Sequence, residues 1–216
     1  MNVYMLLDRS GSMNDNGLIK EAIGSINAYA ERLPHNTKIR LAIFDMANNE
    51  FDYQVIRNCK TDDWKNINLE EVTPRGTTPL YDASARMMQT ALDDNPDRAI
   101  FVVMTDGIEN ASQKYNKHEV KTLVEKFKSK AWEVIFLGAN FDKVGDVAKD
   151  YGLGADKWLN STQRNLRETM FSLAQSSADY ATRGIVMGFS EQDKIKAGSD
   201  ENSSEKGKAS DPAAAA

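Results

Sequence analysis

Hydrophobic positions along the chain follow two different spacings. Three short segments are continuously apolar: 3–7, 100–104 and 134–137. Such runs are typical of strands that are buried on both faces of a parallel sheet. Apolar residues recur at steps of three and four over three longer segments: 19–33, 80–91 and 117–130. This spacing predicts amphipathic helices. Strands that alternate with helices predict a doubly wound, mostly parallel α/β sheet with helices on both faces, which is a Rossmann-like fold.

The remaining patterns complete a six-stranded sheet. Residues 39–43 and 51–55 alternate between apolar and polar, and the segment 46–49 between them is typical of a hairpin turn. One strand is therefore expected to be antiparallel and to lie at an edge of the sheet. The polar stretch that continues to Arg75 predicts a loop, and it contains Cys59. The other expected elements are a short helix near 144–148, a brief strand near Trp158 and a long helix over 162–182.

The composition changes near the end of the chain. Residues 190–216 include no aromatic residue and a single large aliphatic one, Ile195, and they are rich in Ser, Asp, Glu, Lys and Ala. A segment of this kind buries too little apolar surface to offset the entropy of the chain. We therefore expect one folded domain over 1–188 and a disordered C-terminal tail over 189–216.

Charge and cysteine content narrow the functional classes. The 216 residues include 27 basic and 32 acidic side chains, a net charge of −5, and the basic residues form no cluster. Nucleic acid and membrane surfaces are therefore not expected as partners. The single cysteine, Cys59, excludes an intramolecular disulfide, and the apolar run at 3–7 is too short for a signal peptide. We expect a cytoplasmic protein. His35 and His118 are too few and too scattered for a zinc site.

Three polar segments either follow predicted strands or open a predicted helix: Asp8-Arg9-Ser10-Gly11-Ser12, Gly76-Thr77-Thr78-Pro79 and Thr105-Asp106-Gly107. The first and the third segment come directly after the carboxyl ends of buried strands. In doubly wound sheets, ligands bind beyond this edge, where the strand order reverses. The three segments therefore predict one shared site with two carboxylates and three hydroxyls. Oxygen ligands of this kind suit Mg²⁺ or Mn²⁺ and are poor ligands for zinc or copper.

The order and placement of these segments resemble the von Willebrand factor type A family. The resemblance rests on Asp-x-Ser-Gly-Ser, Gly-x-Thr-Pro-Leu-Tyr-Asp and Thr-Asp-Gly, and it covers about residues 2–185. In that family these segments form the metal-ion-dependent adhesion site (MIDAS). The resemblance implies a metal-binding set of five residues: Asp8, Ser10, Ser12, Thr78 and Asp106. It implies that the hydroxyls reach the metal directly or through water, while the carboxylates bind mainly through water and hold the hydroxyls in place.

The resemblance also implies a function. In this family a Glu or Asp carboxylate of a protein partner completes the coordination of the metal. The chain is therefore expected to be a protein-binding module that depends on Mg²⁺, or on Mn²⁺, and not an enzyme. Many members have Gly-Gly-Thr where this chain has Gly76-Thr77-Thr78. The register with Pro79 favours Thr78 as the ligand, and Thr77 stays open as the alternative.

Other functions compatible with the motifs stay open. A phosphotransferase of the haloacid-dehalogenase type also has an Asp after its first strand, but it normally has a second Asp two positions later as general acid, where this chain has Ser10. An accessory subunit of an AAA-type ATPase or of a ribonucleoprotein complex is a further alternative. In a purely structural interpretation, Asp8 and Asp106 only cap helices and bind loop amides.

Four charged residues near the three segments receive structural interpretations. We expect Asp82 to stabilise the first turn of its helix, where the helix dipole favours a carboxylate. Asp142 is expected to cap the short helix that follows it. Arg9 and Arg75 flank the metal segments, and we expect both to be solvated arginines at the surface rather than contacts for an acidic partner.

Overall fold

Six strands form one sheet in the computed structural model, which describes residues 1–198. The order across the sheet is β3-β2-β1-β4-β5-β6. The strands are β1 (Asn2–Asp8), β2 (Lys38–Ala47), β3 (Glu50–Lys60), β4 (Ala99–Thr105), β5 (Glu133–Ala139) and β6 (Trp158–Ser161). Neighbouring strands run parallel except β2 and β3, which form an antiparallel pair at one edge. The predicted six-stranded sheet with an antiparallel edge strand is therefore confirmed.

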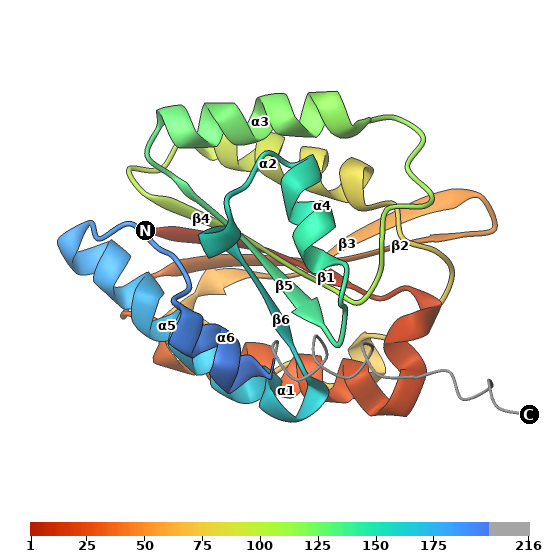
Figure 1. Cartoon of the computed structure of the whole chain (residues 1–216), viewed down its shortest axis with the longest axis horizontal. Helices are drawn as coiled ribbons and strands as arrows, with labels where there is room; N and C mark the ends of the chain where they lie inside the picture. Colours follow the sequence, from red (N-terminus) through yellow and green to blue (C-terminus); the bar gives the residue numbers. More distant parts are fainter. Residues whose placement is uncertain (199–216) are drawn as a thin grey trace, which may run out of the picture.

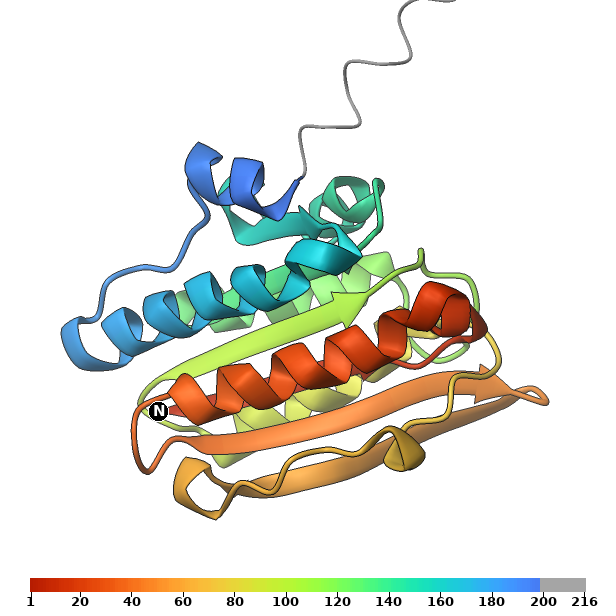
Figure 2. The same cartoon turned by 90° about the horizontal axis from the view of Figure 1, so that it is seen from below.

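Helices cover both faces of this sheet (Figure 1). They are α1 (Leu18–Arg32), α2 (Leu80–Asp94), α3 (Lys117–Ser129), α4 (Val144–Asp150), α5 (Leu166–Arg183) and α6 (Glu191–Ala197). Figure 1 shows α2, α3 and α4 on one side of the sheet and α1, α5 and α6 on the other. In Figure 2, α1 and α5 lie side by side across their face. Among residues 1–198, no helix is both long and apolar enough to cross a membrane.

Alternate residues of β1 enter two separate cores. Val3, Met5 and Leu7 pack in the core that includes residues of α1 and α5. Tyr4 and Leu6 pack in the core on the opposite face, with residues of α2, α3 and α4. Side chains of a strand point alternately to the two faces, so a strand covered on both sides needs apolar residues throughout. This requirement explains the continuous apolar runs that predicted the central strands.

The hairpin between β2 and β3 turns at Asn48 and Asn49. Their φ angles are 54° and 61°, both in the left-handed region. Two consecutive residues of this conformation form the type of turn that matches the twist of a two-stranded ribbon, and Asn tolerates it well. The predicted hairpin turn is therefore confirmed.

The edge strand β3 is longer than predicted. It continues to Lys60, so Cys59 lies in a strand, opposite Ile39, and its assignment to a polar loop is wrong. The pairing of β2 with β3 shifts register between Leu41 and Ala42. An irregularity of this kind interrupts the alternation of inward and outward side chains. The second half of the strand therefore lacks the alternation of apolar and polar residues that predicted its first half.

The described part of the chain ends in α6, inside the segment predicted to be a disordered tail. The N–H of Asp193 donates to the hydroxyl oxygen of Ser190 at 3.2 Å, and the N–H of Ser190 donates to the carboxylate of Asp193 at 2.9 Å. This reciprocal cap starts the helix. α6 buries Ala197, whose carbonyl accepts the N–H of Thr162 at 3.0 Å. The predicted disorder is therefore wrong for α6, and the rest of the predicted tail, 199–216, lies outside the described residues.

Candidate metal centre

Asp8 and Thr105 end two neighbouring strands at the centre of the sheet. β1 and β4 pair in parallel, with Leu7 opposite Met104, so the segments that follow them leave the same edge. The strand order reverses at this pair, because β2 and β3 lie beyond β1 while β5 and β6 lie beyond β4. The first and third predicted segments therefore meet at the switch point of the sheet, where ligands bind in folds of this class.

Asp8 is the buried end of the site. Its side chain is fully buried, and its two carboxylate oxygens accept separate hydrogen bonds. One accepts the N–H of Ser10 at 2.7 Å, and the other accepts the hydroxyl of Thr105 at 2.7 Å. Burial raises the pKa of Asp8 to about 7, against an ordinary value of 3.8. Both hydrogen-bond donors are neutral, so the carboxylate gains no countercharge from them.

Two hydroxyls connect this end of the site to Asp106. The hydroxyl oxygens of Ser10 and Ser12 lie 3.2 Å apart, and the hydroxyl of Ser12 donates to the carboxylate of Asp106 at 2.9 Å. Burial also raises the pKa of Asp106, although Asp106 is only partly buried. Four of the five predicted residues therefore form one hydrogen-bonded chain, in the order Asp8, Ser10, Ser12, Asp106.

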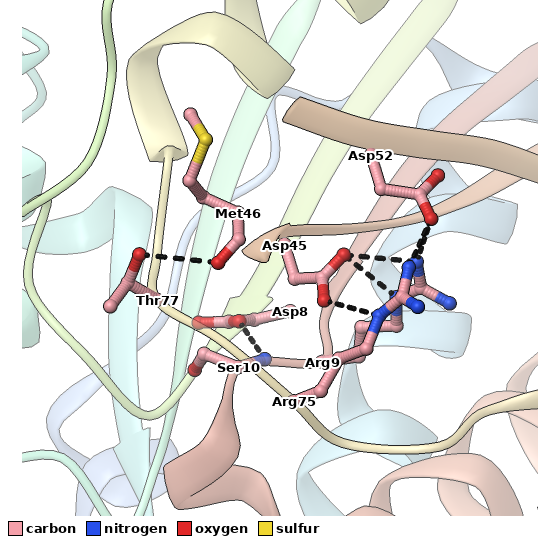
Figure 3. Close-up of polar contacts among 8 residues, drawn as sticks. All are labelled: Asp8, Arg9, Ser10, Asp45, Met46, Asp52, Arg75 and Thr77. Carbon is pink, nitrogen blue, oxygen red and sulfur yellow. Dashed lines mark hydrogen bonds and ion pairs between the residues drawn. The ribbon is translucent and has the colours of Figure 1, made fainter. Parts of the chain in front are cut away.

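The two adjacent threonines of the second segment face different surroundings. A Cβ atom built on Gly107 would lie 3.3 Å from the hydroxyl oxygen of Thr78, so this hydroxyl faces the third segment. Thr78 is itself buried. The hydroxyl of Thr77 donates to the carbonyl of Met46 at 3.4 Å, and Figure 3 shows it pointing to that residue. This geometry favours Thr78 over Thr77 as the candidate ligand.

Backbone hydrogen bonds join the first segment to the second. The N–H of Gly11 donates to the carbonyl of Gly76 at 3.0 Å, and the N–H of Arg75 donates to the carbonyl of Arg9 at 2.8 Å. Gly76 has a left-handed φ of 68°, and a Cβ atom there would lie 2.1 Å from the carbonyl oxygen of Met46. The turn that presents Gly76 to Gly11 therefore requires glycine.

The expectation that Arg9 is solvated is wrong. Arg9 is buried and donates from Nη2 to Asp45 at 2.9 Å and to Asp52 at 2.7 Å. Arg75 is exposed but paired, since its Nε donates to Asp45 at 2.8 Å and its Nη2 contacts Asp52. Figure 3 shows both guanidinium groups between the two carboxylates. Burial of Arg9 follows from its partners on β2 and β3, which the local sequence does not reveal.

Asp82 has the structural role that was expected, but by different contacts. Its carboxylate accepts backbone N–H groups from the loop after β4, at residues 113–115, with donor distances from 2.7 to 3.3 Å. It therefore ties this loop to the start of α2. Asp142 does not cap α4, because Lys143 occupies the N-cap position. The carboxylate of Asp142 instead accepts the side-chain amide of Asn160 at 3.3 Å.

Two residues that position the site were not predicted. Thr105 holds the carboxylate of Asp8, and Asn110 binds the backbone of Thr78. Thr105 was visible as part of its segment, but the sequence does not say that its hydroxyl turns toward Asp8. Asn110 gave no signal, because its partner lies 32 residues earlier in the chain.

The chemistry of the donor set fits a hard divalent cation. The five residues offer only carboxylate and hydroxyl oxygens, and both carboxylates have a pKa that burial raises. A divalent cation would supply the positive charge that stabilises both in the ionised form. Within residues 1–198, no group of three or more His, Cys, Asp or Glu side chains is arranged to hold a metal.

Comparisons with known proteins agree with this doubly wound fold. The sequence model of the von Willebrand factor type A domain matches residues 2–181. The chain therefore belongs to the von Willebrand factor type A domain family. Domains of this family generally act as non-enzymatic modules for protein interaction or adhesion, and they often bind a divalent metal at the MIDAS. A search of curated protein sequences gave no significant match.

Solved structures share the fold at low sequence identity. A von Willebrand factor type A protein from Catenulispora acidiphila is 13% identical, with a TM-score of 0.60, over 82% of this chain and 42% of its own. VWA2, an ArnB paralog from Sulfolobus acidocaldarius, is 16% identical, with a TM-score of 0.59, over 80% and 44%. The pilus adhesin SpaC from Lactobacillus rhamnosus GG is 12% identical, with a TM-score of 0.62, over 83% and 30%. The chain spans less than half the length of each.

Proposed function

We propose that this chain is a protein-binding module that depends on a divalent metal. The metal-binding set is Asp8, Ser10, Ser12, Thr78 and Asp106. In this proposal they hold Mg²⁺, or Mn²⁺, and an Asp or Glu carboxylate of a protein partner completes the coordination. A cytoplasmic setting is part of the proposal, supported by the single cysteine.

The observation that carries the proposal is the hydrogen-bonded chain from Asp8 to Asp106 at the switch point of the sheet. This series of hydrogen bonds passes from the fully buried carboxylate of Asp8, through the buried Ser10, to the exposed Ser12. Its inner end is therefore held rigidly by the protein, while its outer end is open to solvent. In this proposal, a partner's carboxylate approaches from that open end.

Each of the five residues has a distinct task in this proposal. Asp8 and Asp106 orient the hydroxyls, since Asp106 already accepts the Ser12 hydroxyl and Asp8 holds the Ser10 backbone. Ser10, Ser12 and Thr78 present neutral oxygens, which bind a cation without cancelling its charge. When bound, the cation supplies the positive charge that a partner's carboxylate recognises. Because the two carboxylates bind mainly through water in this proposal, the cation keeps enough positive charge to attract an acidic ligand.

The same geometry gives no support to the phosphotransferase alternative. The position expected for the general acid is Ser10, whose hydroxyl lies 3.2 Å from that of Ser12. A serine hydroxyl does not lose a proton near neutral pH and is a poor general acid. We therefore expect no hydrolysis of a phosphate ester such as p-nitrophenyl phosphate in the presence of Mg²⁺.

The proposal is tested by calorimetric titration of Mn²⁺ and Mg²⁺ into the wild-type chain and Asp106→Ala, with and without a glutamate-containing peptide. The wild type should bind the metal, and the peptide should tighten that binding. Asp106→Ala should lose both effects while keeping its circular dichroism spectrum. Pull-downs in Mg²⁺ and in EDTA, compared by mass spectrometry, would then identify the partner.

A matched variant separates loss of a ligand from loss of charge. Asp15 is an exposed acidic residue whose charge acts on Asp106, but it is not in the proposed set. Asp15→Ala removes the same charge from the same face of the protein and should keep most of the metal affinity. Equal binding by the wild type and Asp106→Ala would refute the site, and strong phosphatase activity would restore the enzyme alternative.

A further inference from the structure

Two arginines and two aspartates form an ion cluster beside the metal segments. The cluster consists of Arg9, Asp45, Asp52 and Arg75. Asp45 accepts from Arg9 at 2.9 Å and from Arg75 at 2.8 Å, while Asp52 accepts from Arg9 at 2.7 Å and also contacts Arg75. The inner side chains, Asp45 and Arg9, are 0% and 7% exposed, and the outer ones, Asp52 and Arg75, are 40% and 48% exposed.

The cluster joins four separate parts of the fold. Asp45 lies on β2 and Asp52 on β3. Arg9 belongs to the first metal segment, next to Ser10, and Arg75 directly precedes the second. Figure 3 shows the cluster on the side of these segments that faces the β2–β3 hairpin. Its four side chains therefore fasten both segments to the same two strands.

Backbone hydrogen bonds run through the same region. The N–H of Arg9 donates to the carbonyl of Phe44 at 3.1 Å, and the carbonyl of Arg9 accepts the N–H of Arg75 at 2.8 Å. The next bond joins the N–H of Gly11 to the carbonyl of Gly76. These residues come two positions after Arg9 and one position after Arg75. This short ladder fixes the distance between the two segments, and Arg9 and Arg75 belong both to the ladder and to the ion cluster.

We propose that the ion cluster is a positioning device for the metal site. Arg9, Asp45, Asp52 and Arg75 hold the first segment, which carries Ser10, and the second, which carries Thr78, at a fixed spacing. This proposal rests on the proposed function. Mg²⁺ demands near-ideal octahedral geometry, so small changes in the spacing of its ligands weaken binding. Residues that orient metal ligands typically change metal affinity by about 10-fold to 100-fold.

The charge of the cluster gives the proposal a sharp test. With two positive and two negative side chains it has no net charge, so it does not attract a cation. Arg75→Gln removes a positive charge near the site, and electrostatics alone would therefore tighten Mn²⁺ binding. Loss of positioning has the opposite sign. We expect Arg75→Gln to weaken Mn²⁺ binding about 10-fold in calorimetric titration, and unchanged or tighter binding would overturn the proposal.

Arg57→Gln is the matched control for stability. Arg57 also lies on β3 and pairs with a carboxylate, since it donates to Glu71 at 2.7 and 2.8 Å, but it is not part of the metal segments. This variant should lose stability without losing Mn²⁺ affinity. If Arg75→Gln does not fold, Arg75→Lys replaces it. Lysine keeps the charge but cannot contact both aspartates through separate nitrogens, so weaker Mn²⁺ binding supports the proposal and unchanged binding overturns it.

Amide hydrogen exchange in metal-free protein decides the proposal independently of metal binding. In Arg75→Gln, the amides of Gly11 and residue 75 should exchange at least about 10-fold faster than in the wild type, because their hydrogen bonds join the two segments. The same amides should be unchanged in Arg57→Gln. Unchanged exchange in both variants would overturn the positioning role. A wild type that binds no metal would instead overturn the proposed function, and the exchange rates would still show whether the cluster holds the segments together.

Discussion

Asn110 hydrogen-bonds to both backbone groups of Thr78. Its side-chain oxygen accepts the N–H of Thr78 at 2.9 Å, and its own N–H donates to the carbonyl of Thr78 at 3.2 Å. Thr78 is the proposed metal ligand of the second segment, and Asn110 belongs to the loop that follows the third segment. The second and third segments are therefore held together by two bonds between one pair of residues, just as the ion cluster and its ladder hold the first and the second.

Replacing Asn110 should weaken metal binding more than it weakens the fold. Asn110→Leu keeps the size of the side chain but removes the acceptor for the N–H of Thr78. Because Asn110 is exposed, we expect a loss of about 1 kcal/mol in the free energy of unfolding, measured by urea denaturation. Mn²⁺ affinity should fall about 10-fold. Asn110→Asp keeps the acceptor and should keep the affinity. Equal affinity in wild type and Asn110→Leu would show that Thr78 does not depend on this contact.

Gly76→Ala should destabilise the protein more than any ordinary glycine substitution. Gly76 has a φ of 68°, and the new Cβ would lie 2.1 Å from the backbone oxygen of Met46. The left-handed conformation alone costs a residue with a side chain about 1–2 kcal/mol, and the backbone contact must be relieved as well. Gly17 has a similar φ of 76° with nothing within 4 Å, so Gly17→Ala isolates the conformational cost. Comparable urea midpoints for the two variants would argue against a clash at Gly76.

The sheet and the metal segments could be predicted from the sequence because their signals are local. Buried strands are continuous apolar runs, and the candidate ligands of the first segment are spaced at every second residue from Asp8 to Ser12. The switch-point rule then places the segment after β1 beside that after β4 without any knowledge of contacts. Membership of the von Willebrand factor type A domain family agrees with the resemblance that these segments carried.

The contacts that hold the segments together could not be predicted, because their partners are distant in the chain. Arg9 is separated from Asp45 by 36 residues and from Asp52 by 43. A single arginine after a strand has no local feature that distinguishes a buried ion pair from a solvated side chain. The start of α6 is a different case. Its capping pair, Ser190 and Asp193, is a local feature that indicates the start of a helix. The low hydrophobicity of the segment nevertheless led to the prediction of a disordered tail.

Removing α6 should destabilise the domain. α6 buries Ala197, accepts a backbone hydrogen bond at the end of β6, and places Lys194 over the ring of Trp158 at 5.8 Å. A chain that ends after Phe189 loses these contacts at β6, which is an edge strand of the sheet. We expect a loss of about 1–3 kcal/mol in the free energy of unfolding. A chain that ends after Gly198 is the control and should match the full chain in urea denaturation, and equal stability of both truncations would contradict the prediction.

Asp8 should contribute less to the stability of the metal-free protein as pH rises, because its carboxyl group is buried. Its pKa is raised from 3.8 to about 7 by burial, so between these values the folded protein holds a proton that the unfolded chain has released. Folding is favoured by that proton at low pH, and the advantage is lost as pH rises through the folded pKa. The loss attributable to Asp8 is on the order of 4 kcal/mol.

Asp8→Asn isolates this effect and separates stability from binding. The amide does not titrate, so the difference in unfolding free energy between wild type and Asp8→Asn should change over the range from about pH 4 to pH 7 and be flat above it. Metal-free Asp8→Asn should therefore be the more stable protein above pH 7, although it should lose Mg²⁺ binding.

Saturating Mg²⁺ should restore the stability of the wild type at high pH, because a metal binds the ionised carboxylate and stabilises the folded state that holds it. Urea denaturation across this pH range, with and without Mg²⁺, measures both proteins. Parallel curves for wild type and Asp8→Asn in the absence of metal would show that Asp8 does not titrate in this range, and an unchanged wild-type curve in Mg²⁺ would show that the ionised Asp8 does not gain from the cation.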